Sequence, residues 1–247
     1  MADGMHQENF IRVAVSLSKP GQVRSPLIID TDAVEIRLDL FTEPIEEDLI
    51  FLKNHYHNPI ILTLRSNQEG GMFTGNSVSW IERITPLLPY VTMVDVETGF
   101  SEHATLLRDM GKKIIASCHK NEMLLRQDLN LLAKDLKKFG DIAKIAVRPR
   151  NNADILTLLN FIEEIEKPII VSVTGTGNRH ARPLLALFGS LYTYSYIDNP
   201  TSPGQYSISE LKHLGHLLSP GFPDTSTEDI TKGTVNKGTH NGVSGNN

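Results

Sequence analysis

Short runs rich in valine and isoleucine recur along the chain, separated by segments with apolar residues at helical spacing. Eight of these runs read as buried strands, and they cover residues 11–17, 33–40, 59–65, 91–97, 112–119, 142–149, 168–175 and 191–197. Between them, apolar residues stand three and four positions apart, as in Val78, Ile81 and Ile84 after the N-cap candidate Asn76. Strand followed by helix, repeated about eight times, predicts a parallel sheet covered by helices.

The number of repeats favours a closed barrel over an open sheet. Eight units in roughly 210 residues match a small (β/α)8 TIM barrel, which needs about 200 to 250. An open doubly wound sheet is the alternative, but its glycine-rich loop belongs after the first strand, whereas the weak echo here, VTGTGN, follows the seventh. We therefore expect one α/β domain, a TIM barrel, over residues 1–220.

After Pro220 the composition changes. Residues 221–247 are rich in glycine, threonine, serine and asparagine and have almost no apolar periodicity. Such a segment cannot bury enough surface to offset the entropy lost on ordering. The sequence predicts a flexible polar tail there, to which we assign no chemistry.

Composition and charge narrow the function classes. With 24 Lys+Arg against 29 Asp+Glu, the net charge is -5 and the basic residues are scattered, which argues against a nucleic-acid partner. Apolar runs are too short to span a bilayer, and MADGMHQENF lacks the pattern of a secretory signal, so we expect a cytoplasmic protein without a membrane partner. The single cysteine, Cys118, allows neither an internal disulfide nor a paired-cysteine metal site.

Charged residues gather near the carboxyl ends of the predicted strands, where TIM-barrel enzymes place their active sites. They are Glu35, Arg37, Asp39, Arg65, Glu69, Asp95, Glu97, His119, Lys144, Arg179 and Arg182. Structural interpretations compete for most of them, because polar layers inside small barrels also neutralise one another. For Glu35, Arg37 and Asp39 taken alone, a structural role and a substrate contact are equally open.

Lys144 is harder to interpret as structural. It shares a strand face with Ile142 and Ala146, so it points into the barrel with them or outward with them. Burial and nearby cations lower a lysine pKa, and a neutral amine can attack a ketone to form an imine. His119, on the preceding strand, could then remove a proton and return it to a leaving group. The residues alone predict a Schiff-base barrel enzyme for an oxygenated, anionic small molecule and leave the substrate open.

At these residues the sequence resembles type I 3-dehydroquinate dehydratase, the imine-forming enzyme of the shikimate pathway. The matching runs, in order, are EIRLDL, TLRSNQEGG, DVE, IIASCH, AKIAVRP, ARPLLALFGSLYTYSY and SPGQYSISEL. They extend from residue 35 to about 211 and so cover nearly all of the expected barrel. The resemblance implies a homodimer that converts 3-dehydroquinate to 3-dehydroshikimate, the third step toward chorismate and the aromatic amino acids. It implies no metal and no organic cofactor.

The resemblance also implies a role for each matching position. Lys144 looks like the imine-forming lysine, His119 the general acid/base, and Glu69 the carboxylate that orients this histidine. Substrate contacts are implied for Glu35, Arg37, Arg65, Arg182, Thr201, Ser202 and Gln205. Arg182 falls where the family pairs an arginine with the substrate carboxylate, and the last three belong to a loop that closes over the substrate. Whether Arg179 shares the carboxylate with Arg182 is left open.

Two other functions compete with this interpretation. A class I aldolase also forms an imine on a barrel lysine but breaks a carbon–carbon bond. A catalytically silent barrel that binds a metabolite is a different class, although it would have no need to hold Lys144, His119 and Glu69 together.

Overall fold

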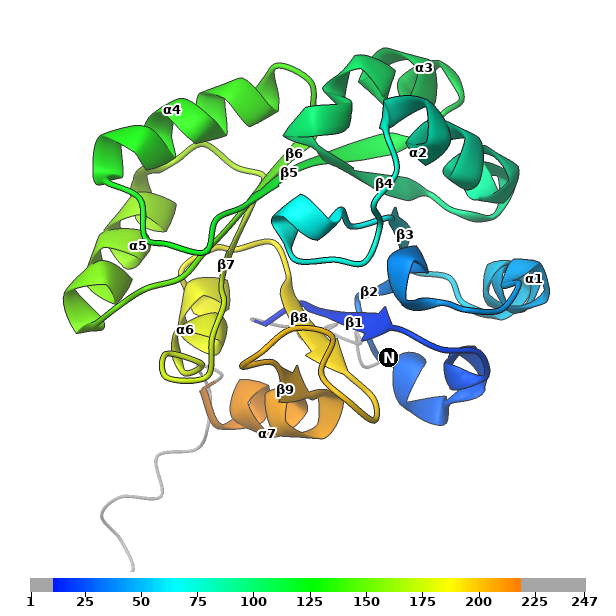
Figure 1. Ribbon diagram of the computed structural model, residues 1–247. Helices are drawn as coiled ribbons and strands as arrows, with labels where there is room; N and C mark the ends of the chain where they lie inside the picture. The colour runs from blue at the N-terminus through cyan, green and yellow to red at the C-terminus, as the bar shows by residue number, and fades with distance from the viewer. Residues whose placement is uncertain (1–10, 219–247) are drawn as a thin grey trace, which may run out of the picture.

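The protein is a parallel barrel surrounded by helices (Figure 1). The computed structural model describes residues 11–218, and the tail predicted for 221–247 lies outside this range. The predicted TIM-barrel fold is confirmed, and the eight strands fall within the predicted ranges. They are β1 Val13–Leu17, β2 Ala33–Arg37, β3 Ile60–Thr63, β4 Met93–Glu97, β5 Lys113–His119, β6 Ile142–Val147, β7 Ile169–Val173 and β8 Thr193–Tyr196. A short ninth strand, β9 Tyr206–Ser207, pairs in parallel with β8.

Helices follow seven of the eight barrel strands. They are α1 Glu46–His55, α2 Ser77–Ile84, α3 Ala104–Asp109, α4 Arg126–Lys137, α5 Asn152–Glu164, α6 Ala181–Leu187 and α7 Ile208–Leu218. After β1, two 3-10 turns, Gln22–Arg24 and Pro26–Ile28, take the place of a helix. Over residues 11–218, no helix has both the length and the apolar character that crossing a membrane requires.

The helix after β3 begins at the N-cap that the sequence predicts, and Trp80 determines which of its faces is buried. Asn76 caps α2, because its Oδ1 accepts a hydrogen bond from Ser79 N at 2.9 Å. Val78 is 61% exposed, whereas Trp80 is fully buried. The large indole, which is not part of the spacing Val78, Ile81 and Ile84, determines which side of this short helix packs inward.

The barrel closes without a strand ladder between β7 and β8. The sheet order is β7-β6-β5-β4-β3-β2-β1-β8-β9, so β8 pairs with β1. At the remaining seam, Leu191 N donates to the carbonyl of Ile169 at 2.8 Å, and Val171 N donates to Ser190 Oγ at 3.0 Å. Hydrogen bonds from the segment before β8 therefore close the ring.

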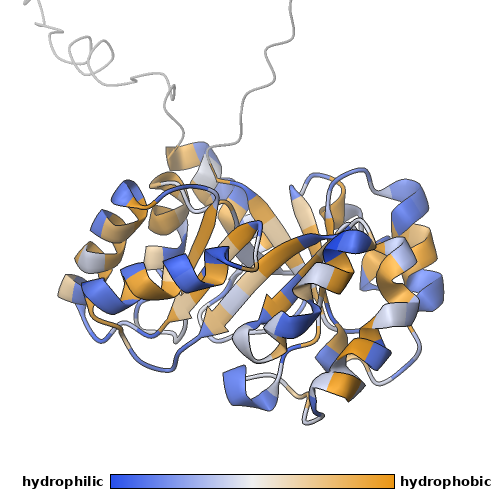
Figure 2. Cartoon of the chain, turned by 90° about the horizontal axis from the view of Figure 1, so that it is seen from above, coloured by the Kyte–Doolittle hydropathy of each residue, from blue (hydrophilic) through white to orange (hydrophobic). Residues whose placement is uncertain are grey.

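Strand alternation places polar side chains inside the upper half of the barrel. Outward-facing residues such as Val34, Leu62 and Ile145 pack against the helices, and Figure 2 shows apolar residues along the strands and on the sides of the helices that face them. A lower inward layer is apolar and contains Ala14, Ala33, Ile61, Met93, Ile115, Ile142 and Ile170. Two residues further along the same strands, the inward positions are Ser16, Glu35, Thr63, Asp95, Ser117, Lys144 and Ser172. Because side chains alternate with period two, this polar layer lies above the apolar one, toward the carboxyl ends of the strands.

Candidate active site

One pocket at the carboxyl ends of the strands brings together the ten side chains to which the resemblance assigns a role. Its lining includes Glu35, Arg37, Arg65, Glu69, His119, Lys144, Arg182, Thr201, Ser202 and Gln205. These residues come from β2, β5, β6, α6 and the segments that follow β3 and β8. Their positions agree with the expectation that the functional residues lie at this end of the barrel.

Lys144 points into the barrel and is only 4% exposed. Its Nζ donates to Asp95 Oδ2 at 2.8 Å, lies 3.6 Å from Glu35 Oε1, and is 4.2 Å from the ring centroid of Tyr194. Burial works against the charged form, but Asp95 and the other acidic neighbours outweigh it, so the pKa of Lys144 is raised. The expectation of a lowered lysine pKa is wrong, because Asp95 on β4 is a counter-ion for Lys144 and the spacing of residues along β6 does not reveal it.

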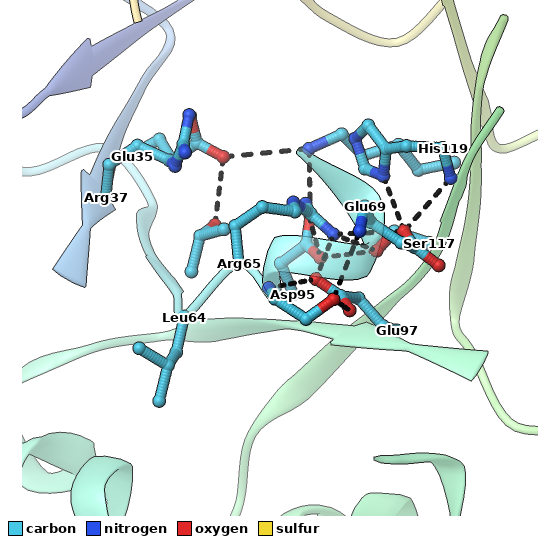
Figure 3. A network of polar contacts seen from close by, with 12 residues as sticks. Glu35, Arg37, Leu64, Arg65, Glu69, Asp95, Glu97, Ser117 and His119 are labelled. Carbon is cyan, nitrogen blue, oxygen red and sulfur yellow. Dashed lines mark hydrogen bonds and ion pairs between the residues drawn. The ribbon is translucent and has the colours of Figure 1, made fainter. Parts of the chain in front are cut away.

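Arg65 lies in the middle of a cluster of carboxylates (Figure 3). Its guanidinium is 3.0 Å from Asp95 Oδ1, 2.9 Å from Glu97 Oε1 and 3.5 Å from Glu69 Oε2. Although burial opposes its charge, Asp95 and Glu97 raise the pKa of Arg65. The same cation, together with Lys144, lowers the pKa of Asp95 against the opposing effect of burial. Arg65 thus holds the acidic side chains of the polar layer in place.

His119 and Glu69 form a hydrogen-bonded pair. His119 Nδ1 is 2.8 Å from Glu69 Oε2, which also accepts from the backbone N–H of His119 at 3.0 Å. Burial, then Arg65 and Lys144, hold the pKa of His119 well below its usual value, and burial raises the pKa of Glu69 to about 7. We assign a neutral imidazole whose Nδ1–H donates to Glu69, so that Nε2 is left as the basic nitrogen.

Arg182 is a buried cation without a carboxylate partner in residues 11–218. Its guanidinium is within 3.4 Å of Ser172 Oγ and 3.3 Å of the carbonyl of Pro203, and its Nε has no hydrogen-bond partner among the described residues. Burial, then the neighbouring Arg179, lowers the pKa of Arg182 to about 10. An arginine held this way favours an anionic ligand.

Arg179 does not share this position. Its guanidinium lies 3.8 Å from the ring centroid of Tyr206 and 3.2 Å from Glu210 Oε1, and Arg179 does not line the pocket. Of the two arginines that the sequence left as candidates, the geometry therefore offers Arg182 alone to a ligand in the pocket.

The loop after β8 is tied together by Gln205. Its Oε1 accepts from the backbone N–H groups of Thr201 and Ser202, at 2.7 and 3.2 Å. Arg37 connects this loop to β2, because its Nη1 donates to the carbonyl of Thr201 at 3.3 Å. Gln205 thus presents both hydroxyl residues of the loop to the pocket.

Glu35 and Arg37 also have protein partners. Glu35 accepts hydrogen bonds from Ser16 Oγ at 2.5 Å and Thr63 Oγ1 at 2.9 Å. Arg37 pairs with Asp39 through two contacts, Nε to Oδ1 at 2.9 Å and Nη2 to Oδ2 at 2.8 Å. Glu35 and Arg37 therefore have structural partners within the protein and also line the pocket.

Two side chains beside Lys144 were given no role in the sequence analysis. Asp95 was noted at the end of its strand, and its even spacing from Glu97 was the signal that both face the interior. Tyr194 reads from the sequence as one of several core aromatics, because nothing in LYTYSY distinguishes the tyrosine that faces Lys144. Arg148 also lines the pocket, with its Nη1 3.2 Å from Asn121 Oδ1.

Comparisons with known proteins agree on one family. The sequence model of the family described as Type I 3-dehydroquinase matches residues 20–220. The 3-dehydroquinate dehydratase of Methanospirillum hungatei is 47% identical over 87% of this chain and 84% of its own, and that of Methanoregula boonei is 36% identical over 85% and 100%.

Solved structures show the same fold. The 3-dehydroquinate dehydratase of Geobacillus kaustophilus has a TM-score of 0.75 at 22% identity, over 84% of this chain and 91% of that one. The corresponding protein of Aquifex aeolicus has a TM-score of 0.71 at 24% identity, over 84% and 99%. At these identities the likeness concerns the fold alone.

Proposed function

Because the chain belongs to the type I 3-dehydroquinase family and is therefore a hydro-lyase, we propose that it dehydrates 3-dehydroquinate to 3-dehydroshikimate through an imine on Lys144. This is a reaction of the shikimate pathway. One observation carries the proposal: a buried lysine, a histidine paired with Glu69, and an arginine that has no carboxylate partner within residues 11–218 all line one pocket. The lysine suits a substrate ketone, the histidine suits a proton transfer, and the arginine suits a substrate carboxylate.

Imine formation begins from the ammonium of Lys144. The ammonium first gives one proton to Nε2 of His119, because only the neutral amine has a lone pair that can bond to the ketone carbon of the substrate. After Nζ bonds to that carbon, the ketone oxygen leaves as water with a second proton from Nζ and the proton returned by His119. Ketone and ammonium thus become iminium and water, and the positive charge on nitrogen is retained. Asp95, 2.8 Å from Nζ, is the counter-ion of the ammonium before this step and of the iminium after it.

Elimination follows at the carbons beside the iminium. Nε2 of His119 takes a proton from C2, and the electrons move toward the iminium nitrogen to give an enamine. The histidine, now protonated, gives its proton to the C1 hydroxyl, which leaves as water. Hydrolysis of the conjugated imine releases the product and restores the ammonium. Glu69 is a positioning residue in this sequence, since it holds Nδ1–H and points Nε2 toward the substrate.

The remaining contacts orient the substrate. Arg182 binds the carboxylate with two parallel hydrogen bonds, which its flat guanidinium is shaped to donate. Glu35, Arg37 and Arg65 meet the ring hydroxyls, while Thr201, Ser202 and Gln205 cover the substrate from the loop after β8. The location in the cytoplasm and the homodimer stay predictions of the sequence.

Two measurements test the proposal. Purified protein mixed with 3-dehydroquinate should develop the ultraviolet absorbance of the conjugated enone product, whereas an aldolase would leave that signal flat. Borohydride added during turnover should reduce the imine and leave a stable mass increase on the peptide that contains Lys144. A catalytically silent barrel would acquire no such mass, and an adduct on a different lysine would refute the assignment.

Two variants of Lys144 separate chemistry from binding. Lys144→Ala removes the nucleophile but also leaves Asp95 without its ammonium partner, which by itself destabilises the fold. Lys144→Arg keeps a positive charge beside Asp95 and lacks the amine. We expect neither variant to turn over or to be trapped, and we expect Lys144→Arg to unfold at nearly the temperature of the unaltered protein. Measurable turnover by Lys144→Arg would contradict the proposed role.

A further inference from the structure

We propose that the hydroxyl of Tyr194 is a substrate-contact group that donates a hydrogen bond to the ketone oxygen while Lys144 forms the imine. This inference rests on the proposed function, and it adds a residue to which the resemblance assigned no role. Tyr194 lies on β8, faces the interior and is 5% exposed. It lines the same pocket as Lys144 and His119.

The first observation is an unsatisfied buried hydroxyl. Tyr194 Oη makes no hydrogen bond of good geometry within residues 11–218, and the polar group that interacts with it is the ammonium of Lys144, which can donate a hydrogen bond but cannot accept one. A buried hydroxyl without a partner costs free energy that a phenylalanine at the same position would not. The neighbouring polar layer shows the contrast, since Ser16, Thr63 and Ser117 all donate to carboxylates. The hydroxyl proton of Tyr194 is therefore available for donation to a group that enters the pocket.

The second observation is the position of the ring. Lys144 Nζ lies 4.2 Å from the ring centroid of Tyr194, so the aromatic ring stabilises the ammonium through a cation–π contact. A carbon bonded to Nζ carries its oxygen into the space that the phenol borders. Burial raises the pKa of Tyr194, against the opposing effect of Lys144, so the phenol stays protonated and acts as a donor.

The chemistry needs a donor at this place. As Nζ bonds to the ketone carbon, the C=O electrons move onto oxygen, and a donor that holds this oxygen stabilises the developing charge. The oxygen then leaves as water with two protons that came from the ammonium of Lys144. Tyr194 ends the step with its own proton, so it holds the oxygen without any net proton transfer.

Tyr194→Phe tests the assignment, with Tyr192→Phe as its matched control. Phenylalanine keeps the ring beside Nζ and removes the hydroxyl alone. Tyr192 lies on the same face of the chain one layer lower, in the apolar cluster, and does not line the pocket. The measurement is the rate at which the Lys144 adduct appears, followed by quenching with borohydride at successive times after mixing with 3-dehydroquinate.

We expect the adduct to form about tenfold more slowly in Tyr194→Phe, the loss that removal of one hydrogen bond from a transition state produces. The isotope effect measured with substrate deuterated at C2 should shrink, because proton removal contributes less to the overall rate when imine formation is slow. The unfolding temperature should equal or exceed that of the unaltered protein, since an unsatisfied buried hydroxyl is lost. Tyr192→Phe should keep the rate of adduct formation.

Adduct formation at the same rate in both variants would overturn the role of Tyr194 and leave the proposed function standing. If Tyr194→Phe slowed turnover but kept the full isotope effect, the hydroxyl would act in a later step, which would also overturn this assignment. No adduct on Lys144 in the unaltered protein would remove both the proposed function and this inference.

Discussion

The ammonium of Lys144 and the carboxylate of Asp95 form a buried ion pair, with Nζ 2.8 Å from Oδ2 and with both side chains at most 5% exposed. Asp95 also accepts from Arg65 and Ser117, so it connects the catalytic lysine to the rest of the polar layer. A buried charge that loses its partner destabilises a protein strongly. The pair therefore contributes to the fold as well as to the chemistry.

We expect Asp95→Asn to lower the free energy of unfolding by about 3 kcal/mol, near the lower end of the cost of breaking a buried pair, because the amide oxygen still accepts a hydrogen bond. The pKa of Asp95 is lower in the folded protein than in the unfolded chain. Its carboxylate therefore stabilises the fold fully when the pH is above the unfolded-state pKa, and this stabilisation is lost as the pH falls toward the folded-state pKa. Urea unfolding should show that the difference in free energy of unfolding between the unaltered protein and Asp95→Asn becomes smaller by about 1 kcal/mol from neutral pH to pH ~3.

The same variant should change the chemistry of the lysine. Without the Asp95 carboxylate, the largest influence that raises the pKa of Lys144 disappears, and burial then lowers it. An amine-selective acylating reagent should modify Lys144 of Asp95→Asn at a lower pH than in the unaltered protein, as read by peptide mass. If the lysine reacted at the same pH in both, Asp95 would not be the group that holds it charged.

A second prediction concerns the pH dependence of Glu69. Its pKa is raised to about 7 by burial, so the carboxyl is protonated below this pH and charged above it. Glu69→Gln resembles the protonated form, because its amide oxygen still accepts from Nδ1–H of His119. We expect the variant to lose roughly tenfold in kcat/KM at about pH 8.5, where the unaltered protein has a charge-assisted hydrogen bond, and much less at about pH 5.5.

The pH profiles of kcat/KM also distinguish the titration of Glu69 from that of His119. Because the pKa of His119 is held well below its usual value, the loss of activity toward acid, where the imidazole is protonated, should lie below about pH 6.5. Because Glu69 is itself protonated below about pH 7, Glu69→Gln should leave this acidic limb of the profile nearly in place. A ratio between the two proteins that stayed constant with pH would show that Glu69 does not titrate in the range we infer.

The parts of the site that could be predicted are those that depend on one strand at a time. Alternation places Lys144 on the same strand face as Ile142 and Ala146, although it leaves open whether that face points inward. The expectation that His119 lies on the neighbouring strand follows from the order of the strands, and the pairing of β5 with β6 sets Ser117 opposite Lys144. The barrel itself follows from eight repeats of strand and helix. Each of these conclusions needs only the spacing of residues along the chain.

The parts that could not be predicted depend on which strands face one another across the barrel. Asp95 reaches Lys144 from β4, two strands away, and no spacing along the chain reports that contact. The direction of the lysine pKa was wrong for this reason. Likewise, Arg179 and Arg182 stand three residues apart, and only the packing of Tyr206 and Glu210 against Arg179 separates their positions.

A third prediction uses those two arginines as a matched pair. Arg182→Met should raise KM for 3-dehydroquinate by about 100-fold, since a carboxylate loses a bidentate partner, while kcat changes little. It should also raise the unfolding temperature, because it removes a buried cation that lacks a carboxylate partner among the described residues. Arg179→Met also removes one positive charge, which lies beside Glu210, and it should leave KM nearly unchanged. If Arg179→Met raised KM as much as Arg182→Met, the carboxylate would not be bound by Arg182 alone.

The last prediction concerns the backbone that carries Thr201, Ser202 and Gln205. Gly204 has a φ of +83°, and a Cβ built on it would lie 2.2 Å from the carbonyl oxygen of Gly175, which leaves no room for alanine. Gly204→Ala should therefore push the loop after β8 away from the loop after β7, lower kcat/KM by at least about tenfold and cost about 1 to 3 kcal/mol of stability. Gly177→Ala is the matched control, because no atom of the described part of the chain lies within 4 Å of its added Cβ. Steady-state kinetics and urea unfolding of the two variants test the point, and equal effects from both substitutions would show that the close approach of Gly204 to Gly175 does not hold the loop over the pocket.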